Sequence, residues 1–250
     1  MKWVLLRGLT REARHWGSFA TQFEAQLAPC TVTALDLPGN GEFQKHASPI
    51  TVDGIVTFAR QQLLAQDIKP PYALLAMSLG AMVATSWAQR YPVEVSHLVL
   101  VNTSMRPASI TQRLRPAQWL PLLALAARWG DAPYAERSIY SLTCNYAAQR
   151  ATDLMAWQHI RRSAPVSRAN ALRQLIAAAR FACAVQTPRC PALVLSSKAD
   201  RLVNPLCSTQ LAAAWQVPHQ AHPWAGHDAP HDDARWVCER VAEWCLLLNQ

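Results

Sequence analysis

The residues Y-A-L-L-A-M-S-L-G, numbers 72–80, decide how the rest of the sequence is interpreted. The first six of them form an apolar run that predicts a strand buried on both faces. The pattern that follows, residues 79–91, is typical of a helix and ends before Pro92. Two small residues, Ala76 and Gly80, lie two positions before and two positions after Ser78 at this strand-to-helix junction. The combination predicts a tight turn that lifts the Ser78 hydroxyl above the edge of the sheet, where a nucleophile would stand.

Apolar runs of strand length recur along the chain and alternate with helix patterns. Besides 72–77, the strand candidates are 3–6, 31–35, 97–101, 192–196 and 220–224. The main helix candidates are 16–28, 51–67, 79–91, 205–216 and 231–248. Strands that are linked by crossover helices pair in parallel, and right-handed crossovers put helices on both faces of the sheet. The sequence therefore predicts an α/β fold with one six-stranded, mainly parallel sheet.

One long segment interrupts this alternation. Residues 106–189 contain no strand run but four helix patterns, at 111–129, 134–144, 147–162 and 168–183. We interpret this segment, called the insertion below, as a helical cap between the fourth and fifth strands. No linker or repeat marks it as a separate domain. The core then comprises residues 1–105 and 190–250.

A serine at neutral pH needs a base to take its proton and an acid to orient that base. Loops past the last two predicted strands supply both groups, since Asp200 follows the run at 192–196 and His227 follows the run at 220–224. The carboxyl ends of parallel strands meet at one edge of a sheet, where α/β folds assemble their sites. We therefore expect Ser78, Asp200 and His227 to act together.

Two alternatives to this assignment stay open. Asp36 or Asp67 could orient the histidine in place of Asp200. Residues 219–233 are rich in His and Asp, and such clusters bind zinc in some proteins. They lack the spacing of a known metal motif, so we expect neither a metal nor an organic cofactor.

Six landmarks along the chain resemble those of the α/β-hydrolase superfamily. They are L-L-R-G-L (5–9), D-L-P-G-N-G (36–41), A-M-S-L-G (76–80), L-V-L-V-N (98–102), A-L-V-L-S-S-K-A-D (192–200) and A-G-H (225–227). Together they cover nearly the whole chain. Within the superfamily the sequence is most similar to small capped carboxylesterases, including those that cleave the methyl ester of pimeloyl-acyl-carrier protein. Compared with the family, the first pair of strands is missing.

The resemblance implies an oxyanion hole and also shows where this chain departs from the family. The backbone N–H groups of Leu9 and Leu79 would bind the oxyanion. Arg7 stands where the family usually has His, and Ala76 replaces the first Gly of the nucleophile turn. Some relatives carry their acid at the position of Asn102, which leaves Asp200 for that role here.

Composition limits the class of protein. Hydrophobic residues make up 51% of the 250 residues and charged residues 16%, which favours a folded domain with a large core. The longest apolar run, 119–127, is shorter than the roughly 20 residues of a spanning helix. The N-terminal M-K-W-V-L-L-R-G is too short for an export signal, and the seven scattered cysteines fit neither a disulfide framework nor a zinc ribbon. We expect a cytoplasmic protein with reduced thiols.

Positive charge is concentrated in the insertion. It holds twelve arginines, no lysine and three acidic residues, a net charge of +9, whereas the whole chain carries +8. Such a surface either keeps the helices in solution or binds an anionic partner such as acyl-carrier protein or coenzyme A. We expect no nucleic-acid partner.

The sequence as a whole predicts a serine hydrolase that cleaves a small carboxylic ester through an acyl-enzyme. Arg7, Trp16, Trp119 and Trp157 are the candidates for substrate binding, because an acyl site needs large flat surfaces and Arg7 would place a charge beside it. One alternative is a thioesterase, carrier-ester esterase or acyltransferase that acts on an anionic acyl carrier. The other is a binding protein that keeps the hydrolase fold without turnover.

Overall fold

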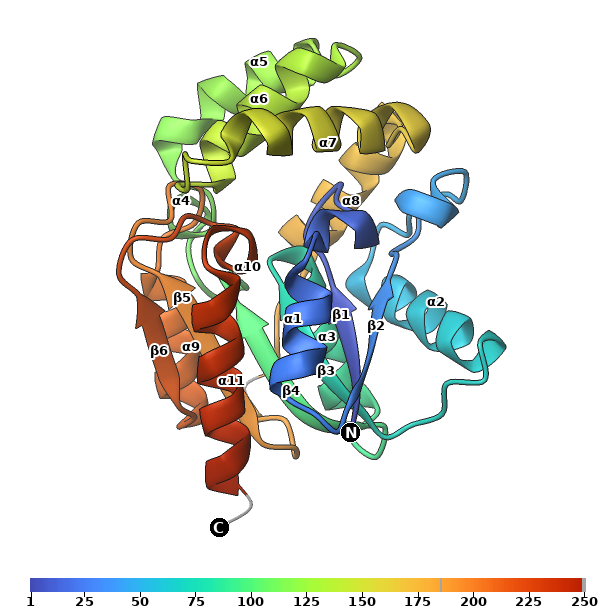
Figure 1. The fold of residues 1–250 in the computed structure, drawn as a ribbon, viewed down its shortest axis with the longest axis vertical. Helices are drawn as coiled ribbons and strands as arrows, with labels where there is room; N and C mark the ends of the chain where they lie inside the picture. Colours follow the sequence, from blue (N-terminus) through green and yellow to red (C-terminus); the bar gives the residue numbers. More distant parts are fainter. Residues whose placement is uncertain (185, 249–250) are drawn as a thin grey trace.

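Six strands form one sheet at the centre of the computed structural model, which describes residues 1–184 and 186–248 (Figure 1). The strands are β1 Lys2–Leu6, β2 Thr31–Leu35, β3 Tyr72–Met77, β4 Val95–Val101, β5 Ala192–Ser197 and β6 His219–His222. Their order across the sheet is β2-β1-β3-β4-β5-β6, and every neighbouring pair is parallel. The predicted six-stranded parallel sheet is confirmed. Residue 185 of the insertion and residues 249–250 of the core lie outside the described residues.

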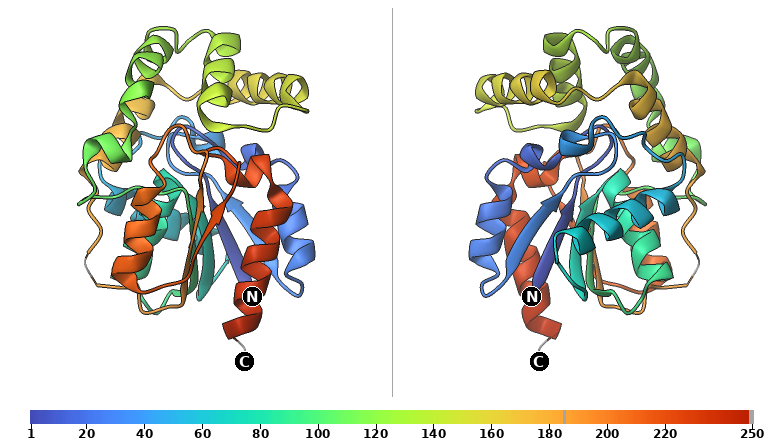
Figure 2. Two further views of the ribbon diagram at one scale, coloured as in Figure 1. Left: turned by 90° about the vertical axis from the view of Figure 1, so that its left-hand side faces the viewer. Right: turned by 90° about the vertical axis from the view of Figure 1, so that its right-hand side faces the viewer.

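Helices cover both faces of the sheet, as expected for strands that are apolar on both sides. One layer contains α1 Phe19–Gln26 and α11 Ala234–Leu248, and the other contains α2 Val52–Ala65, α3 Leu79–Arg90 and α9 Leu206–Trp215 (Figures 1 and 2). Successive strand residues serve opposite layers, since Leu5 of β1 packs in the first and Leu6 in the second. The sheet is therefore the middle of three layers.

The insertion adds helices between β4 and β5, beyond the edge of the sheet where the strands end (Figure 2). They are α4 Ile110–Arg113, α5 Trp119–Ala127, α6 Ala132–Thr143, α7 Arg150–Ser163 and α8 Arg168–Arg180. The predicted helical insertion is confirmed, while its limits at 106 and 189 remain our proposal. Among the described residues, no helix has the length and apolar character needed to cross a membrane.

The helix expected over 231–248 is interrupted at Asp233, between α10 Ala229–Asp232 and α11. Two further predicted elements are wrong in their extent, and proline explains both. The single helix expected over 111–129 is divided into α4 and α5, because Pro116 forces the preceding residue, Arg115, out of the helical region. The last strand ends at His222, before Pro223, and does not reach residue 224. A proline has no N–H for the ladder of a sheet.

The order of the strands reverses direction between β1 and β3. The chain moves from β1 outward to β2 and then returns to place β3 on the other side of β1. Open α/β sheets bind their ligands at such a reversal, outside the carboxyl ends of the strands. Arg7 and Gly8 follow the end of β1, and Ser78 follows the end of β3.

Candidate active site

Ser78 stands on a strained turn between β3 and α3. Its φ of 53° and ψ of −119° are unusual for a residue with a side chain. The hydroxyl makes no capping hydrogen bond to α3, although serine often caps a helix. A Cβ on Gly8 would lie 3.1 Å from Ser78 Cβ and 3.6 Å from Ser78 Oγ. The turn therefore presents the Ser78 hydroxyl next to the loop that follows β1.

The imidazole of His227 is hydrogen-bonded to the carboxylate of Asp200. His227 Nδ1 lies 2.7 Å from Asp200 Oδ2, and both side chains are buried. The other oxygen, Oδ1, accepts from the backbone N–H groups of Leu202 and Val203 at 2.8 and 2.9 Å. Asp200 is thus held in place, and its bond to Nδ1 leaves Nε2 as the basic nitrogen of the ring.

The two alternative carboxylates are engaged elsewhere. Asp36 accepts from the backbone N–H groups of Ala13 and Glu42 at 2.6 and 2.9 Å. Asp67 is exposed and forms an ion pair with Lys69 at 3.1 Å. Among the described residues, Asp200 is the acid that contacts the imidazole of residue 227.

The surroundings of His227 raise its pKa. Burial favours the neutral ring and lowers the pKa, as does the charge of Arg7, but the charge and hydrogen bond of Asp200 and the charge of Asp228 together outweigh them. Nε2 is buried and has no hydrogen-bond partner in the described part of the chain. A basic nitrogen with a raised pKa that is free to accept a proton is suited to general-base catalysis.

The residues after β4 join the loops of Ser78 and His227. Asn102 Nδ2 donates to the backbone oxygen of His227 at 2.8 Å and to Ser197 Oγ at 2.9 Å. The next residue, Thr103, donates to the backbone oxygen of Ser78 at 3.3 Å. Because these two residues are consecutive, the two loops lie side by side. Sequence reasoning saw Asn102 only as a missing acid, and no local signal indicated this contact.

Two backbone N–H groups, those of Leu9 and Leu79, flank the Ser78 turn. Leu79 is the first residue of α3, so its N–H has no acceptor within the helix. Leu9 follows Gly8, which contacts Ser78. Neither N–H donates to a protein acceptor within the described residues. Unpaired N–H groups at a helix N-terminus and a turn can bind an anion.

Arg7 is buried and forms a bidentate ion pair with Asp228, the residue after His227. Nη1 lies 3.0 Å from Oδ1, and Nη2 lies 2.5 Å from Oδ2. Burial alone would raise the pKa of Asp228, but attraction by Arg7 outweighs it and lowers the pKa. Two guanidinium nitrogens of a residue predicted to bind substrate are thus occupied by a protein carboxylate.

The three tryptophans predicted to bind substrate lie in different surroundings. Trp16 is buried, and the guanidinium carbon of Arg7 is 4.7 Å from its ring centre. Trp157 is buried in the insertion, with the guanidinium carbon of Arg11 at 4.4 Å. Trp119 begins α5 and is 42% exposed. Thus Trp16 and Trp157 contact arginines of the loop after β1, whereas Trp119 stands at the surface.

A buried ion cluster that sequence reasoning missed joins this loop to the insertion. Glu136 of α6 is fully buried and accepts from Arg11 at 2.7 Å and from Arg161 of α7 at 3.0 Å. The backbone N–H of Arg11 in turn donates to the oxygen of Gly8 at 3.2 Å. The three charged residues are far apart in the chain, and each by itself has the pattern of a surface residue.

The His- and Asp-rich segment 219–233 makes hydrogen bonds within the protein. His222 Nε2 lies 3.1 Å from Asp233 Oδ2, and Asp232 accepts from the backbone N–H of Gly226 at 2.6 Å. In the described part of the chain, no three His, Cys, Asp or Glu side chains gather as metal ligands. These contacts shape the loop that carries His227.

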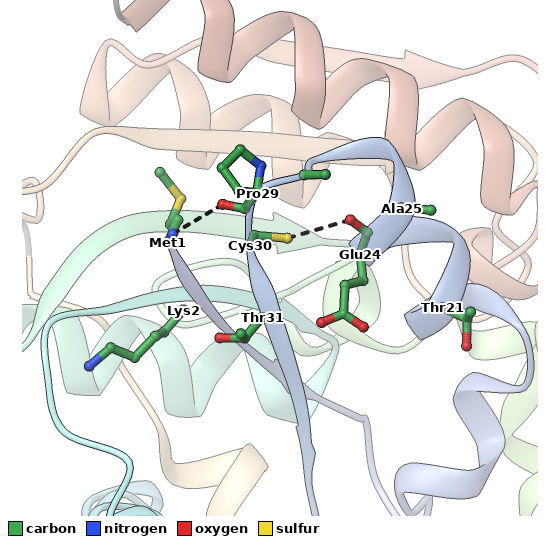
Figure 3. A pocket seen from close by; sticks show the side chains of 9 residues that line it. Met1, Lys2, Thr21, Glu24, Ala25, Pro29, Cys30 and Thr31 are labelled. Carbon is green, nitrogen blue, oxygen red and sulfur yellow. Dashed lines mark hydrogen bonds between the residues drawn. The ribbon is translucent and has the colours of Figure 1, made fainter.

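A hollow in the surface lies away from these residues. Figure 3 shows Met1, Lys2, Glu24 and Cys30 among the residues that line it. The hollow is at the start of β1 and β2, whereas Ser78 follows the end of β3. It therefore lies at the opposite edge of the sheet from the candidate active site.

Comparison with known sequences agrees with this fold. Residues 3–240 match the model of the alpha/beta hydrolase family. A protein of Klebsiella pneumoniae (strain 342) with the name "Putative carbamate hydrolase RutD" is 29% identical over 242 residues, which cover 92% of this chain and 86% of that protein.

Solved structures share the fold over almost the whole chain. The enol-lactonase from Burkholderia xenovorans LB400 has a TM-score of 0.79 at 17% identity, covering 98% of this chain and 91% of its own. A thermophilic esterase from Thermogutta terrifontis has a TM-score of 0.77 at 20% identity, covering 100% of this chain and 91% of its own. At these identities the likeness shows the fold alone. The family match over residues 3–240 goes further, and the chain is a hydrolase that belongs to the alpha/beta hydrolase family.

Proposed function

We propose that this hydrolase cleaves carboxylic esters through an acyl-enzyme, with Ser78 as nucleophile, His227 as base and Asp200 as the acid that orients the base. The observation that carries the proposal is the buried His227–Asp200 hydrogen bond of 2.7 Å, on a loop that lies beside the Ser78 turn. Nε2 of His227, which has no hydrogen-bond partner among the described residues, is the atom that would receive the serine proton.

The first half of the reaction acylates the enzyme. Ser78 Oγ forms a bond to the acyl carbon while His227 Nε2 takes the hydroxyl proton, and Asp200 stabilises the imidazolium. The carbonyl oxygen becomes an oxyanion and accepts from the N–H groups of Leu9 and Leu79. Loss of one such donor costs about 3–4 kcal/mol in comparable enzymes. The bond to the alkoxy group then breaks, and His227 gives the proton to the departing alcohol.

The second half releases the acid. A water molecule attacks the acyl carbon held by Ser78, and His227 takes a proton from the water. Collapse of this second intermediate breaks the bond to Ser78 Oγ, which regains its proton from His227. The products are a carboxylic acid and the free enzyme.

Hydrolysis of p-nitrophenyl esters from acetate to decanoate, together with fluorophosphonate labelling, tests the proposal. We expect the wild type to hydrolyse part of this series and to be labelled, and Ser78→Ala to lose both activities. Since RutD is named for carbamates, a p-nitrophenyl carbamate belongs in the series. If the wild type is labelled but hydrolyses only the carbamate, the substrate class in this proposal changes from carboxylic esters to carbamates. If the wild type shows neither labelling nor turnover, the non-catalytic alternative is supported.

A second candidate function is hydrolysis or transfer of an acyl group that is held by an anionic carrier. The observation that favours it is the number of exposed arginines on the insertion, namely Arg106, Arg128, Arg137, Arg150, Arg162, Arg168, Arg173, Arg180 and Arg189. Attraction between exposed charges weakens as salt screens them. This function predicts that kcat/KM for acyl-coenzyme A falls steeply with added salt, whereas kcat/KM for a neutral ester does not. A cytoplasmic location, argued from the pattern of cysteines, stays part of the proposal.

A further inference from the structure

Arg7 contacts three of the loops that meet at the candidate active site. Its backbone leads directly into Gly8, which lies against Ser78. Its Nη1 is 3.1 Å from the sulfur of Met77, the residue before Ser78. Its guanidinium group is paired with the carboxylate of Asp228, the residue after His227, and the two side chains are 2% and 4% exposed. One buried guanidinium therefore connects the ends of β1 and β3 with the loop after β6.

A buried ion pair of this kind fixes the relative position of its two partners more than it stabilises the fold. Removing two charges from water costs roughly as much as their attraction returns, so apolar pairs of similar volume are often as stable or more stable. A bidentate pair between guanidinium and carboxylate, however, fixes both the distance and the relative orientation of its two partners. Apolar side chains at positions 7 and 228 would fill the space without fixing either.

We propose that Arg7 and Asp228 are positioning residues, which hold the Ser78 turn and the Gly8–Leu9 loop in register with the His227 loop. The inference rests on the proposed function, because it gives the pair a role in acyl transfer from Ser78. Misplacement of reacting groups by about 1 Å lowers a rate by about 100-fold in comparable enzymes. The pair therefore acts on kcat and leaves the binding of a small ester little changed.

The same pair balances the charges around His227. The charged groups that face its ring are Asp200 from the loop after β5, Asp228 from its own loop and Arg7 from the loop after β1. The two carboxylates favour the imidazolium, whereas Arg7 disfavours it. Removing only the charge of Asp228 therefore leaves Arg7 opposed by Asp200 alone and lowers the pKa of His227, and removing both charges of the pair largely cancels this change.

Three variants separate positioning from support of the fold. In Arg7→Met/Asp228→Leu, we expect a folded protein with wild-type circular dichroism, KM for a p-nitrophenyl ester within threefold of the wild type, and kcat reduced by about 100-fold. In Asp228→Asn, we expect a lower midpoint for the acid limb of kcat/KM. The double variant should return this midpoint close to that of the wild type while kcat stays low.

The matched control is Arg60→Met/Glu94→Leu. Arg60 and Glu94 form another bidentate pair, at 2.8 and 2.5 Å, next to Tyr91 and away from the strand ends that carry Ser78 and His227. We expect this control to keep the wild-type kcat and the wild-type midpoint.

The outcomes also separate this inference from the proposed function. Wild-type kcat in Arg7→Met/Asp228→Leu, or an unchanged midpoint in Asp228→Asn, would overturn the positioning role while Ser78→Ala still tests the nucleophile. A wild type without ester turnover would overturn the proposed function. In that case, the pKa of the His227 ring is measured by nuclear magnetic resonance titration, with the signal assigned by its loss in His227→Gln. A lower pKa of His227 in Asp228→Asn than in the wild type would then support the role of the pair.

Discussion

Gly80 lies so close to the end of β1 that a Cβ at this position would be 2.4 Å from the backbone oxygen of Leu6. It would also be 2.6 Å from the backbone oxygen of Arg7. Backbone atoms at the end of a strand cannot move aside as a flexible side chain can. The close approach of α3 to β1 brings the Ser78 turn against Gly8, so the geometry of the turn requires glycine at position 80.

Gly80→Ala should therefore weaken both the fold and the site. We expect the free energy of unfolding to fall by about 1–3 kcal/mol, as for other overpacked positions, and kcat to fall at least about tenfold as α3 shifts. Gly130→Ala is the control, because a Cβ on Gly130 would meet nothing within 4 Å. Its effect should stay within about 0.5 kcal/mol. Urea unfolding and ester hydrolysis measure the two quantities, and equal stability of both variants would contradict the packing argument.

The fold was predictable because its signals are local. The apolar run at 72–77 and the helix pattern after it indicate a strand and a crossover helix, and β3 and α3 have these limits within one residue. The segment 111–129 was misinterpreted because its apolar pattern is helical throughout while Pro116 divides it. Backbone chemistry at one proline outweighed the periodicity of the side chains.

The residues proposed for the candidate site could be predicted only where a sequence motif contains them. Ser78, Asp200 and His227 follow strand ends, and strand ends can be read from the sequence. Asp228 pairs with Arg7 across 221 positions of the chain, and no pattern in the sequence joins two such distant residues. The surroundings that tune and hold the proposed triad depend on such long-range contacts, and they emerge only from the folded chain.

The pH dependence of kcat/KM should report the raised pKa of His227. The base must be neutral, so kcat/KM should rise with pH, with a midpoint above the ordinary histidine value of 6.5. Asp200→Asn removes the charge that raises this pKa, so it should lower the midpoint, and kcat should fall by about 10⁴-fold as in other triads. A wild-type midpoint at or below 6.5 would contradict the assignment of His227 as base.

The same raised pKa makes the stability of the fold decrease with pH, whereas activity increases with pH. A pKa that is higher in the folded state than in the unfolded state means that the proton stabilises the fold. This contribution of His227 is complete below the unfolded pKa, and it is lost as pH rises through the folded pKa. The free energy of unfolding, measured with urea across this window, should therefore fall by more in the wild type than in His227→Gln while activity rises.

Asn102→Asp combined with Asp200→Asn should not move the triad to the position that some relatives use. Asn102 Nδ2 donates to the backbone oxygen of His227, while the ring Nδ1 faces Asp200. A carboxylate at position 102 would face that oxygen without a proton to donate. We expect the double variant to show no more ester hydrolysis than Asp200→Asn alone. Recovery of activity would mean that the ring of His227 can turn toward residue 102.

Glu136→Ala should destabilise the protein more than loss of a surface charge does. Glu136 is fully buried between Arg11 and Arg161, whose side chains are 8% and 9% exposed. Removing the carboxylate leaves two buried guanidinium groups without a counter-charge, and breaking such a pair typically costs about 3–5 kcal/mol. Glu239→Ala is the control, because Glu239 pairs with the exposed side chain of Arg235 in α11. Its loss should cost no more than about 0.5 kcal/mol.

Urea unfolding of Glu136→Ala and Glu239→Ala compares the two losses directly. Limited proteolysis shows which part of the chain is destabilised. Glu136 of α6 accepts hydrogen bonds from Arg161 of α7 and from Arg11 in the loop after β1, so its loss should affect the contact between the insertion and the core. We expect Glu136→Ala to be cleaved faster within the insertion than the wild type, since the insertion loses a buried contact with the core. Equal unfolding energies and equal cleavage rates for the two variants would mean that the apolar contacts of the insertion hold it to the core without this cluster.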